Sequence, residues 1–226
     1  DAQESRGLGD VYKRQDLLGI AENFGKPLYV YEGEKITSQY ERLTSAFAKV
    51  KNLRINYAAK ALSNVSVLKF MRHLGAGLDT VSIQEVQLGL SAGFEPKAII
   101  YTPNGVSLNE IENVAKLGVQ INIDNLSLLE QFGTRHPKTP VCIRINPHVM
   151  AGGNSNISVG HIDSKFGISI HQIPHLLRIL ENTAMKINGI HTVSYTHLRA
   201  HETPEHLVFR RRVEKKKGGG GGGGGG

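Results

Sequence analysis

Cysteine and tryptophan are scarce in this sequence, and long apolar runs are missing. The chain has 226 residues, with a single cysteine, Cys142, and no tryptophan. One cysteine cannot form an internal disulfide, so we expect no disulfide framework and a reducing, cytoplasmic location. No apolar run approaches the roughly 20 residues that span a bilayer, and no basic-then-apolar signal opens the chain, so we expect no membrane partner.

Positive charge exceeds negative charge, but much of the excess lies near the C-terminus. The net charge is +7, and residues 193–226 hold seven Lys and Arg against three Glu, which contributes +4 of it. Residues 16–192 carry only about +3, which is ordinary for an enzyme. We therefore predict no nucleic-acid partner, and a basic nucleic-acid-binding arm is the alternative interpretation of the tail.

The two ends lack the periodicity of folded elements. Residues 1–15 read DAQESRGLGDVYKRQ, and residues 193–226 combine scattered histidines, a basic run and nine glycines. GLGDVYKRQ and VSYTHLRAHET resemble translated sequencing adapters, and the polyglycine resembles a translated run of uncalled bases. The alternative is a functional basic arm with a flexible linker. We predict that both ends are foreign, disordered segments and exclude them from the fold.

Between these ends, strand-like and helix-like runs alternate. Residues 16–50 predict a helix start, a strand at PLYVY (27–31) and an amphipathic helix over 34–50. Residues 51–192 predict a series of strands separated by helices, with strands at 53–60, 77–82, 98–103, 119–124, 141–146 and 186–191. The pairs Ser82/Glu85 and Ser107/Glu110 have the spacing of capping boxes at the starts of two of these helices.

The alternation indicates parallel βα units in an α/β protein. Six such units fit either a (β/α)8 barrel or a doubly wound sheet, and periodicity does not separate the two. The lack of GxGxxG after the first strand counts against a dinucleotide-binding sheet. Because a complete barrel needs eight strands and about 250 residues, we predict a partial (β/α)8 TIM barrel with about six of the eight strands.

In such a barrel, the C-terminal ends of the strands face the active site. The polar residues at these ends are Lys60, Asp79, Thr102, Asn104, Asp124, Arg144, Asn146 and His191. A lysine that ends a buried strand is costly to leave charged and unpaired, and burial makes its amine the better nucleophile that a Schiff base needs. The alternative is a lysine whose amine simply reaches solvent.

The other candidates also have two interpretations each. Asp79 could contact Lys60 or a cofactor hydroxyl, or it could be an ordinary acid at a strand end. Arg144 could bind an anion or form a structural salt bridge. His191 could stack on a cofactor ring or fill the core. No spacing of His, Cys and Asp suggests a metal site, so we predict none.

Three segments carry a resemblance to a known family. NYAAKALSN (56–64) resembles the cofactor-lysine motif of the alanine-racemase-like, fold-type III decarboxylases, which use pyridoxal 5'-phosphate (PLP). GLDTVS (77–82) matches the second-strand motif of that group. RINPHVMAGGNSNISVGHIDSKFGI (144–168) is similar to the fifth strand and following loop of the diaminopimelate decarboxylase family. INGIH (187–191) and PLYVY also fit that family, in which the PLYVY strand joins a C-terminal β-domain.

The resemblance implies roles for individual residues. Lys60 would hold PLP through a Schiff base, Ala58 and Asp79 would line the cofactor, and Arg144 and His191 would complete the cofactor contacts. Lys165, Phe166 and Gly167 would shape the mouth of the site. The reaction implied is decarboxylation of meso-2,6-diaminopimelate to L-lysine, by an enzyme that is a homodimer in the intact family.

The sequence also departs from the family pattern. The sixth strand of the family continues to a second histidine, and Val193 stands in its place here. The glycine-rich phosphate loop, the glutamate that pairs with the pyridine nitrogen and the partner subunit's cysteine motif are not found, so we expect an inactive, poorly folding chain. The alternatives are a decarboxylase of another substrate (ornithine, arginine or carboxynorspermidine) and a non-catalytic homologue. The retention of Lys60 counts against the latter.

Overall fold

A computed structural model describes residues 17–25, 27–148 and 166–192, and it divides the chain into two units, Asp1–Leu53 and Arg54–Gly226. In the first unit, α1 spans Leu17–Phe24 and α2 spans Gly33–Ala46. Among the described helices, none combines the length and apolar character that a bilayer crossing needs.

The strand predicted at 27–31 is wrong, because residues 28–32 have no regular secondary structure. The side chains of this segment lie in solvent, with Tyr29 87% exposed and Tyr31 53% exposed. A strand needs a neighbour for its backbone N–H and C=O groups, and no strand of the described residues pairs with this segment. The apolar sequence therefore gives a strand-like pattern without a strand.

The second unit is an α/β structure with a parallel sheet, as predicted. Its strands are β1 (Asn56–Ala58), β2 (Gly77–Thr80), β3 (Ile99–Tyr101), β4 (Gln120–Ile123), β5 (Val141–Asn146), β6 (Ile168–Ser169) and β7 (Ile187–Thr192). They are ordered β1-β2-β3-β4-β5-β6, β7 also pairs with β5, and every pairing is parallel. The short β6 was not predicted, and the predicted sixth strand is β7.

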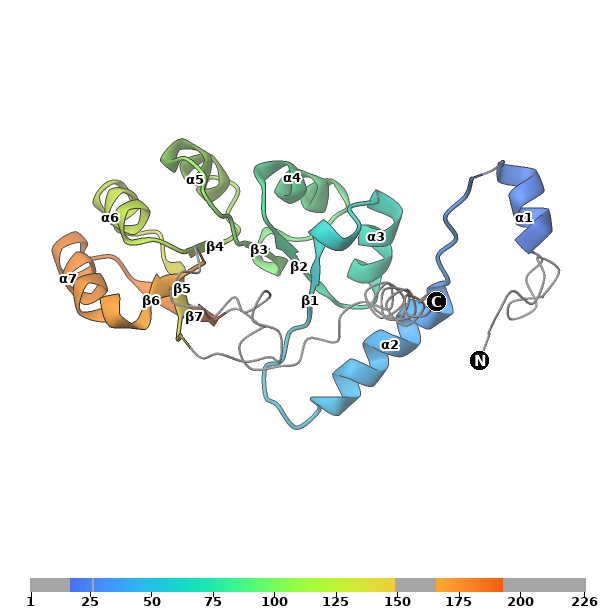
Figure 1. Ribbon diagram of the computed structural model, residues 1–226, viewed down its shortest axis with the longest axis horizontal. Helices are drawn as coiled ribbons and strands as arrows, with labels where there is room; N and C mark the ends of the chain where they lie inside the picture. The colour runs from blue at the N-terminus through green and yellow to red at the C-terminus, as the bar shows by residue number, and fades with distance from the viewer. Residues whose placement is uncertain (1–16, 26, 149–165, 193–226) are drawn as a thin grey trace, which may run out of the picture. The chain divides into compact units, whose positions relative to one another are not determined.

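Five helices follow the strands in chain order and lie along one face of the sheet (Figure 1). They are α3 (Val65–His73), α4 (Ile83–Ser91), α5 (Leu108–Ala115), α6 (Leu126–Arg135) and α7 (Ile173–Thr183). Buried apolar side chains of strands and helices, among them Leu78, Ile99, Ile111, Leu129 and Ile179, fill the space between the layers. This burial supplies the main driving force for the unit.

Half of each predicted capping box is present. Ser82 Oγ accepts from the Glu85 N–H, and Ser107 Oγ accepts from the Glu110 N–H, at 3.3 Å each. The carboxylates, however, do not return to the N-cap residues: Glu85 accepts from the N–H of Val81, and Glu110 accepts from the hydroxyl of Tyr101 at 2.7 Å. Both helices therefore start where predicted, but their acidic residues make other bonds.

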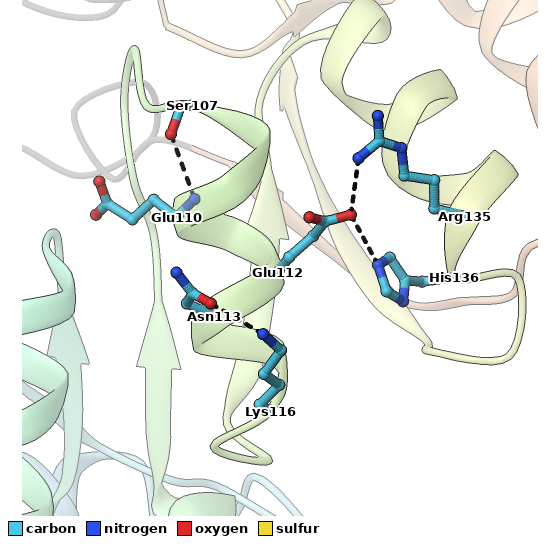
Figure 2. Close-up of polar contacts among 7 residues, drawn as sticks. All are labelled: Ser107, Glu110, Glu112, Asn113, Lys116, Arg135 and His136. Carbon is cyan, nitrogen blue, oxygen red and sulfur yellow. Dashed lines mark hydrogen bonds and ion pairs between the residues drawn. The ribbon is translucent and has the colours of Figure 1, made fainter.

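A partly exposed polar cluster joins α5 to α6 (Figure 2). Glu112 accepts from Arg135 at 3.4 Å and lies 3.0 Å from His136 Nε2, and these bonds hold the pKa of Glu112 below its ordinary value. Lys116 donates to Asn113 on the same helix. These residues lie on the helical layer, so they play no part in the sheet face described next.

Candidate active site

Alternation along the strands separates an apolar face from a polar face of the sheet. A Cβ added to Gly89 of α4 would meet Leu78 Cδ2 at 2.5 Å and Ile99 Cδ1 at 3.2 Å, so these two strand residues point toward the helices. Because side chains alternate, their neighbours Asp79 and Ile100 point to the opposite face, which we call the inner face. Glycine at 89 permits the close approach of α4.

Strand register brings polar residues from different strands to this inner face. Asp79 is in register with Ile100, two residues before Thr102, and Arg144 is in register with His191. Asn122 of β4 is in register with Cys142, two residues before Arg144. The inner face therefore carries Asp79, Thr102, Asn122, Arg144 and His191, four of which are strand-end residues that the sequence analysis named.

Lys60 lies in the 3-10 turn Ala59–Ala61, directly after β1. Its side chain is exposed, which agrees with the alternative of a lysine whose amine reaches solvent rather than with a buried amine. The strand is also shorter than predicted, because it ends at Ala58 rather than continuing to Lys60. Ala58 is half-buried and pairs in register with Asp79. The turn that carries Lys60 therefore begins next to the Asp79 position of the inner face.

Asp79 is a half-buried carboxylate on β2. Burial raises its pKa above the ordinary value, and the hydrogen bond from Thr102 Oγ1 (2.9 Å to Oδ1) and the positive charge of Lys60 oppose that rise. Thr102 is itself 9% exposed. Both alternatives for Asp79 stay open, but its electrostatic contact with Lys60 agrees with the role that the resemblance implies.

Arg144 is a buried cation with one unsatisfied donor. Its side chain is 9% exposed, and its guanidinium lies over the Phe166 ring, with Cζ 4.9 Å from the centroid, in a cation–π arrangement. Burial lowers the pKa of Arg144, while the charges of Asp124 and Asp79 oppose that shift. Its buried Nε has no hydrogen-bond partner among the described residues, and such a donor suits an acceptor on a bound group.

His191 is held neutral on the inner face. Burial and the nearby positive charge of Arg144 lower the pKa of the imidazole to about 4. Its Nδ1 lies 3.5 Å from Asn122 Nδ2. A neutral ring in this position can donate or accept a hydrogen bond or offer an aromatic face, but it does not bring a charge.

The structure also defines the surroundings of Asn122 and Gly167 in this region. Asn122 is 5% exposed and was missed by the sequence analysis, because it lies inside strand QINI rather than at its end. The apolar–polar alternation of that strand was the available signal. Gly167 has φ +84° and lies close to β5, where an added Cβ would be 3.0 Å from Asn146 N, so another residue there would be strained. Lys165 lies outside the described residues.

The remaining strand-end candidates are less closely tied to the site. Asn146 is buried, and its Oδ1 accepts from the N–H of His148. Asn104 is exposed in the loop after β3. Within the described ranges, no group of three His, Cys, Asp or Glu side chains is placed to hold a metal ion. Burial raises the pKa of the Cys142 thiol to about 11, so this cysteine is a poor nucleophile.

Comparison with protein families gives one match. Residues 33–196 match the model of the pyridoxal-binding domain of pyridoxal-dependent decarboxylases. This range contains Lys60, Asp79, Arg144 and His191, and it leaves out most of both segments that resemble adapters.

Individual relatives agree with the family match. The chain is 34% identical to the diaminopimelate decarboxylase of Methanothermobacter thermautotrophicus, over 78% of this chain and 42% of that protein. It is 36% identical to the Helicobacter pylori enzyme of the same name, over 66% of this chain and 38% of that protein. The chain therefore matches only about two fifths of the length of these relatives.

A solved structure shows the same fold. The diaminopimelate decarboxylase of Helicobacter pylori complexed with L-lysine superposes with a TM-score of 0.69 and 31% identity, covering 77% of this chain and 46% of that one. Together with the parallel sheet and its outer helices, this confirms the predicted partial (β/α)8 barrel.

Proposed function

The chain belongs to the family of pyridoxal-dependent decarboxylases, and from that membership we propose that the protein it represents decarboxylates meso-2,6-diaminopimelate to L-lysine. The observation that carries the proposal is the inner face of one sheet, which holds Asp79, Arg144 and His191. Asp79 pairs with Ala58, the last residue of the strand before the Lys60 turn. The diaminopimelate decarboxylases among the relatives support this substrate.

The residues of the inner face fit PLP as the cofactor. Arg144 offers a buried donor, Nε, that no described residue accepts from, and this donor suits an acceptor on a phosphorylated pyridine. Lys60 offers an exposed primary amine that a carbonyl carbon can reach. We propose that Lys60, Ala58, Asp79, Arg144 and His191 hold the cofactor, and that Lys60 is the catalytic residue.

The chain's own groups would prepare the reaction as follows. When bound, PLP supplies the electron sink for the electrons left behind as carbon dioxide departs. The Lys60 amine would hold the cofactor, and its exposure leaves it accessible to an incoming amine. Thr102 holds Asp79 in one orientation through its 2.9 Å hydrogen bond. Arg144 keeps a fixed positive charge on the inner face, and His191 adds an uncharged ring.

The role of Lys60 can be tested in the chain itself. We expect that incubation with PLP followed by borohydride reduction modifies one peptide, the one that contains Lys60, and that Lys60→Ala abolishes the modification. Lys116→Ala is the matched control, because Lys116 is an exposed lysine of the helical layer (Figure 2). Equal modification of many lysines, or unchanged labelling in the Lys60 variant, would contradict the proposal.

The substrate can be tested in the full-length protein that contains this segment. We expect lysine to form from meso-2,6-diaminopimelate at least about 100-fold faster than any product from ornithine or arginine. Preference for one of those substrates would move the protein to a related decarboxylase, and loss of all activity with PLP bound would indicate a non-catalytic homologue. A homodimer and a cytoplasmic location are also part of the proposal, and they rest on the family resemblance and on the single cysteine.

A further inference from the structure

A row of hydrogen bonds crosses the inner face from β2 to β7. Thr102 Oγ1 lies 2.9 Å from Asp79 Oδ1, Asn122 Nδ2 lies 2.9 Å from Thr102 Oγ1, and the same Nδ2 lies 3.5 Å from His191 Nδ1. The two central members are the most enclosed, with Asn122 5% exposed and Thr102 9% exposed. The row therefore connects two proposed cofactor residues through two residues without an assigned role.

The chemistry of the groups fixes the direction of these bonds. An ionised Asp79 can only accept, so the Thr102 hydroxyl must donate its single proton to it. Thr102 Oγ1 then accepts from Asn122, so the side-chain nitrogen of Asn122 faces it. The second proton of that nitrogen points to His191 Nδ1, which must accept. The ring proton of neutral His191 consequently resides on Nε2.

The row also connects strands that are not neighbours. β5 pairs with both β4 and β7, so it lies between them. Side chains of β4 nevertheless reach β7 at two places, Asn122 to His191 and Gln120 to Asn188. The Gln120–Asn188 contact is exposed, whereas Asn122, which contacts His191, is buried. The two contacts between β4 and β7 therefore differ in burial.

We propose that Thr102 and Asn122 are positioning residues. Because the Asp79 carboxylate fixes the direction of the Thr102 hydroxyl, and Thr102 fixes the Asn122 amide, His191 is held as its Nε2–H tautomer. The ring then offers a donor to any group bound on the inner face. The consequence for cofactor binding rests on the proposed function, whereas the tautomer is a property of the chain without added ligand. The low pKa of His191 agrees with a neutral ring at neutral pH.

The tautomer can be read directly by nitrogen NMR of the full chain labelled with 15N-histidine. His191→Gln identifies the His191 signals by difference, and magic-angle spinning of the sedimented chain gives the same information if it associates. At pH 7 we expect Nδ1 to be unprotonated and Nε2 to be protonated. A protonated Nδ1 in the unsubstituted chain would overturn the proposal.

Two variants test the individual positions. Asn122→Asp offers His191 only acceptor atoms, so we expect Nδ1 to become protonated. Thr102→Val keeps the shape but removes the hydroxyl, so we expect Asn122 to lose its fixed orientation and both tautomers of His191 to appear. Asn188→Ala is the control, because it breaks the other β4–β7 contact, and it should leave the signals unchanged.

The remaining outcomes separate this inference from the proposed function. An unchanged His191 in Thr102→Val, in a chain with unaltered circular dichroism, would remove Thr102 from the row and overturn the proposal. A response to Asn188→Ala equal to that of Asn122→Asp would show a general effect of strand displacement, which also overturns it. Failure of Lys60 to bind PLP would contradict the proposed function but would leave these nitrogen signals as expected.

Discussion

Burial gives His191 an ionisation unlike that of an exposed histidine. The ring lies on β7 in register with Arg144, and burial together with that cation lowers its pKa from 6.5 to about 4. The folded chain therefore binds fewer protons than the unfolded chain between these two pH values. This difference has a direct consequence for stability.

We predict that the free energy of unfolding falls as the pH is lowered from about 6.5 to about 4. The contribution of His191 should be about 1–2 kcal/mol, below the full value of the shift because the ring is only half-buried. Urea unfolding at both ends of this window, for the chain and for His191→Gln, measures it. The raised pKa of Asp79 acts in the opposite direction, and the comparison of the two chains separates it. Equal pH dependence in both would contradict the prediction.

At the scale of single residues, strand-end position identified most of the site. Asp79, Thr102, Arg144 and His191 were named from sequence and do lie on one face, because parallel strands with alternating side chains bring such residues together. Their individual roles stay predictions. Asn122 was missed because its position inside a strand looks structural until its neighbours on β3 and β7 are known.

At the scale of the elements, two half-buried glutamates of α5 bond partners of very different burial, Tyr101 at 0% and Arg135 at 62% exposed. Glu110 accepts from the buried Tyr101 of β3 and lies 3.4 Å from the N–H of Ile83, the first residue of α4. Burial and this hydrogen bond raise the pKa of Tyr101 above its ordinary value. Glu112, two residues later, bonds the exposed side chains of the α6 end (Figure 2).

These two glutamates form a matched pair for mutagenesis. We predict that Glu110→Ala lowers the free energy of unfolding by about 1–3 kcal/mol, because it leaves the buried Tyr101 hydroxyl without its acceptor. Glu112→Ala should cost less, and salt should weaken its effect, because its partner Arg135 is 62% exposed and water screens such a pair. Chemical denaturation at low and high salt measures both. An equal loss from the two substitutions would contradict the prediction, since replacement by alanine does not weaken a helix by itself.

The outer strands of the described sheet predict self-association. β1 pairs only with β2 and β7 only with β5 among the described strands, so each has one unpaired edge. Ile190 on β7 is 69% exposed. Edges of this kind invite pairing with another copy. These unpaired strand edges would explain the poor folding that is expected from the sequence.

We therefore expect oligomers of the chain at tens of micromolar in sedimentation velocity. Ile190→Lys should reduce them, because a charge on an edge strand opposes pairing. Leu177→Lys is the control, since Leu177 is 52% exposed but belongs to a helix. A cooperatively melting monomer that is unaffected by either substitution would contradict the expectation.

At the scale of the whole molecule, most of the excess positive charge lies in a different part of the chain from the proposed site. Residues 193–226 carry +4 of the net +7 and lie outside the described residues, whereas the residues of the inner face lie between Asp79 and His191. Electrostatic attraction to a phosphate backbone follows the density of Lys and Arg. Any affinity for nucleic acid should therefore depend on the tail.

We predict that deletion of residues 193–226 removes any salt-dependent binding to duplex DNA, as measured by fluorescence anisotropy at several salt concentrations. The control is deletion of the nine glycines 218–226 alone, which shortens the tail but keeps its charge. Binding retained by residues 16–192 would contradict the prediction and favour a nucleic-acid role for the folded part.

The sequence by itself determined the α/β class, the order of strands and helices in the second unit apart from the short β6, and the polar residues at the strand ends. These follow from local periodicity, capping residues and short motifs, which act over a few neighbouring positions. The sequence wrongly predicted a strand at PLYVY, because an apolar pattern does not supply the partner strand that its backbone groups need.

The tertiary structure alone decided which side chains meet. The exposure of Lys60, the unsatisfied Nε of the buried Arg144 and the row from Asp79 to His191 depend on strand register and on chain folding between distant positions. Register is a non-local property, since a shift of one residue would turn every side chain of a strand to the opposite face. For that reason Asn122 becomes a member of the site only when β4 lies beside β3 and β5.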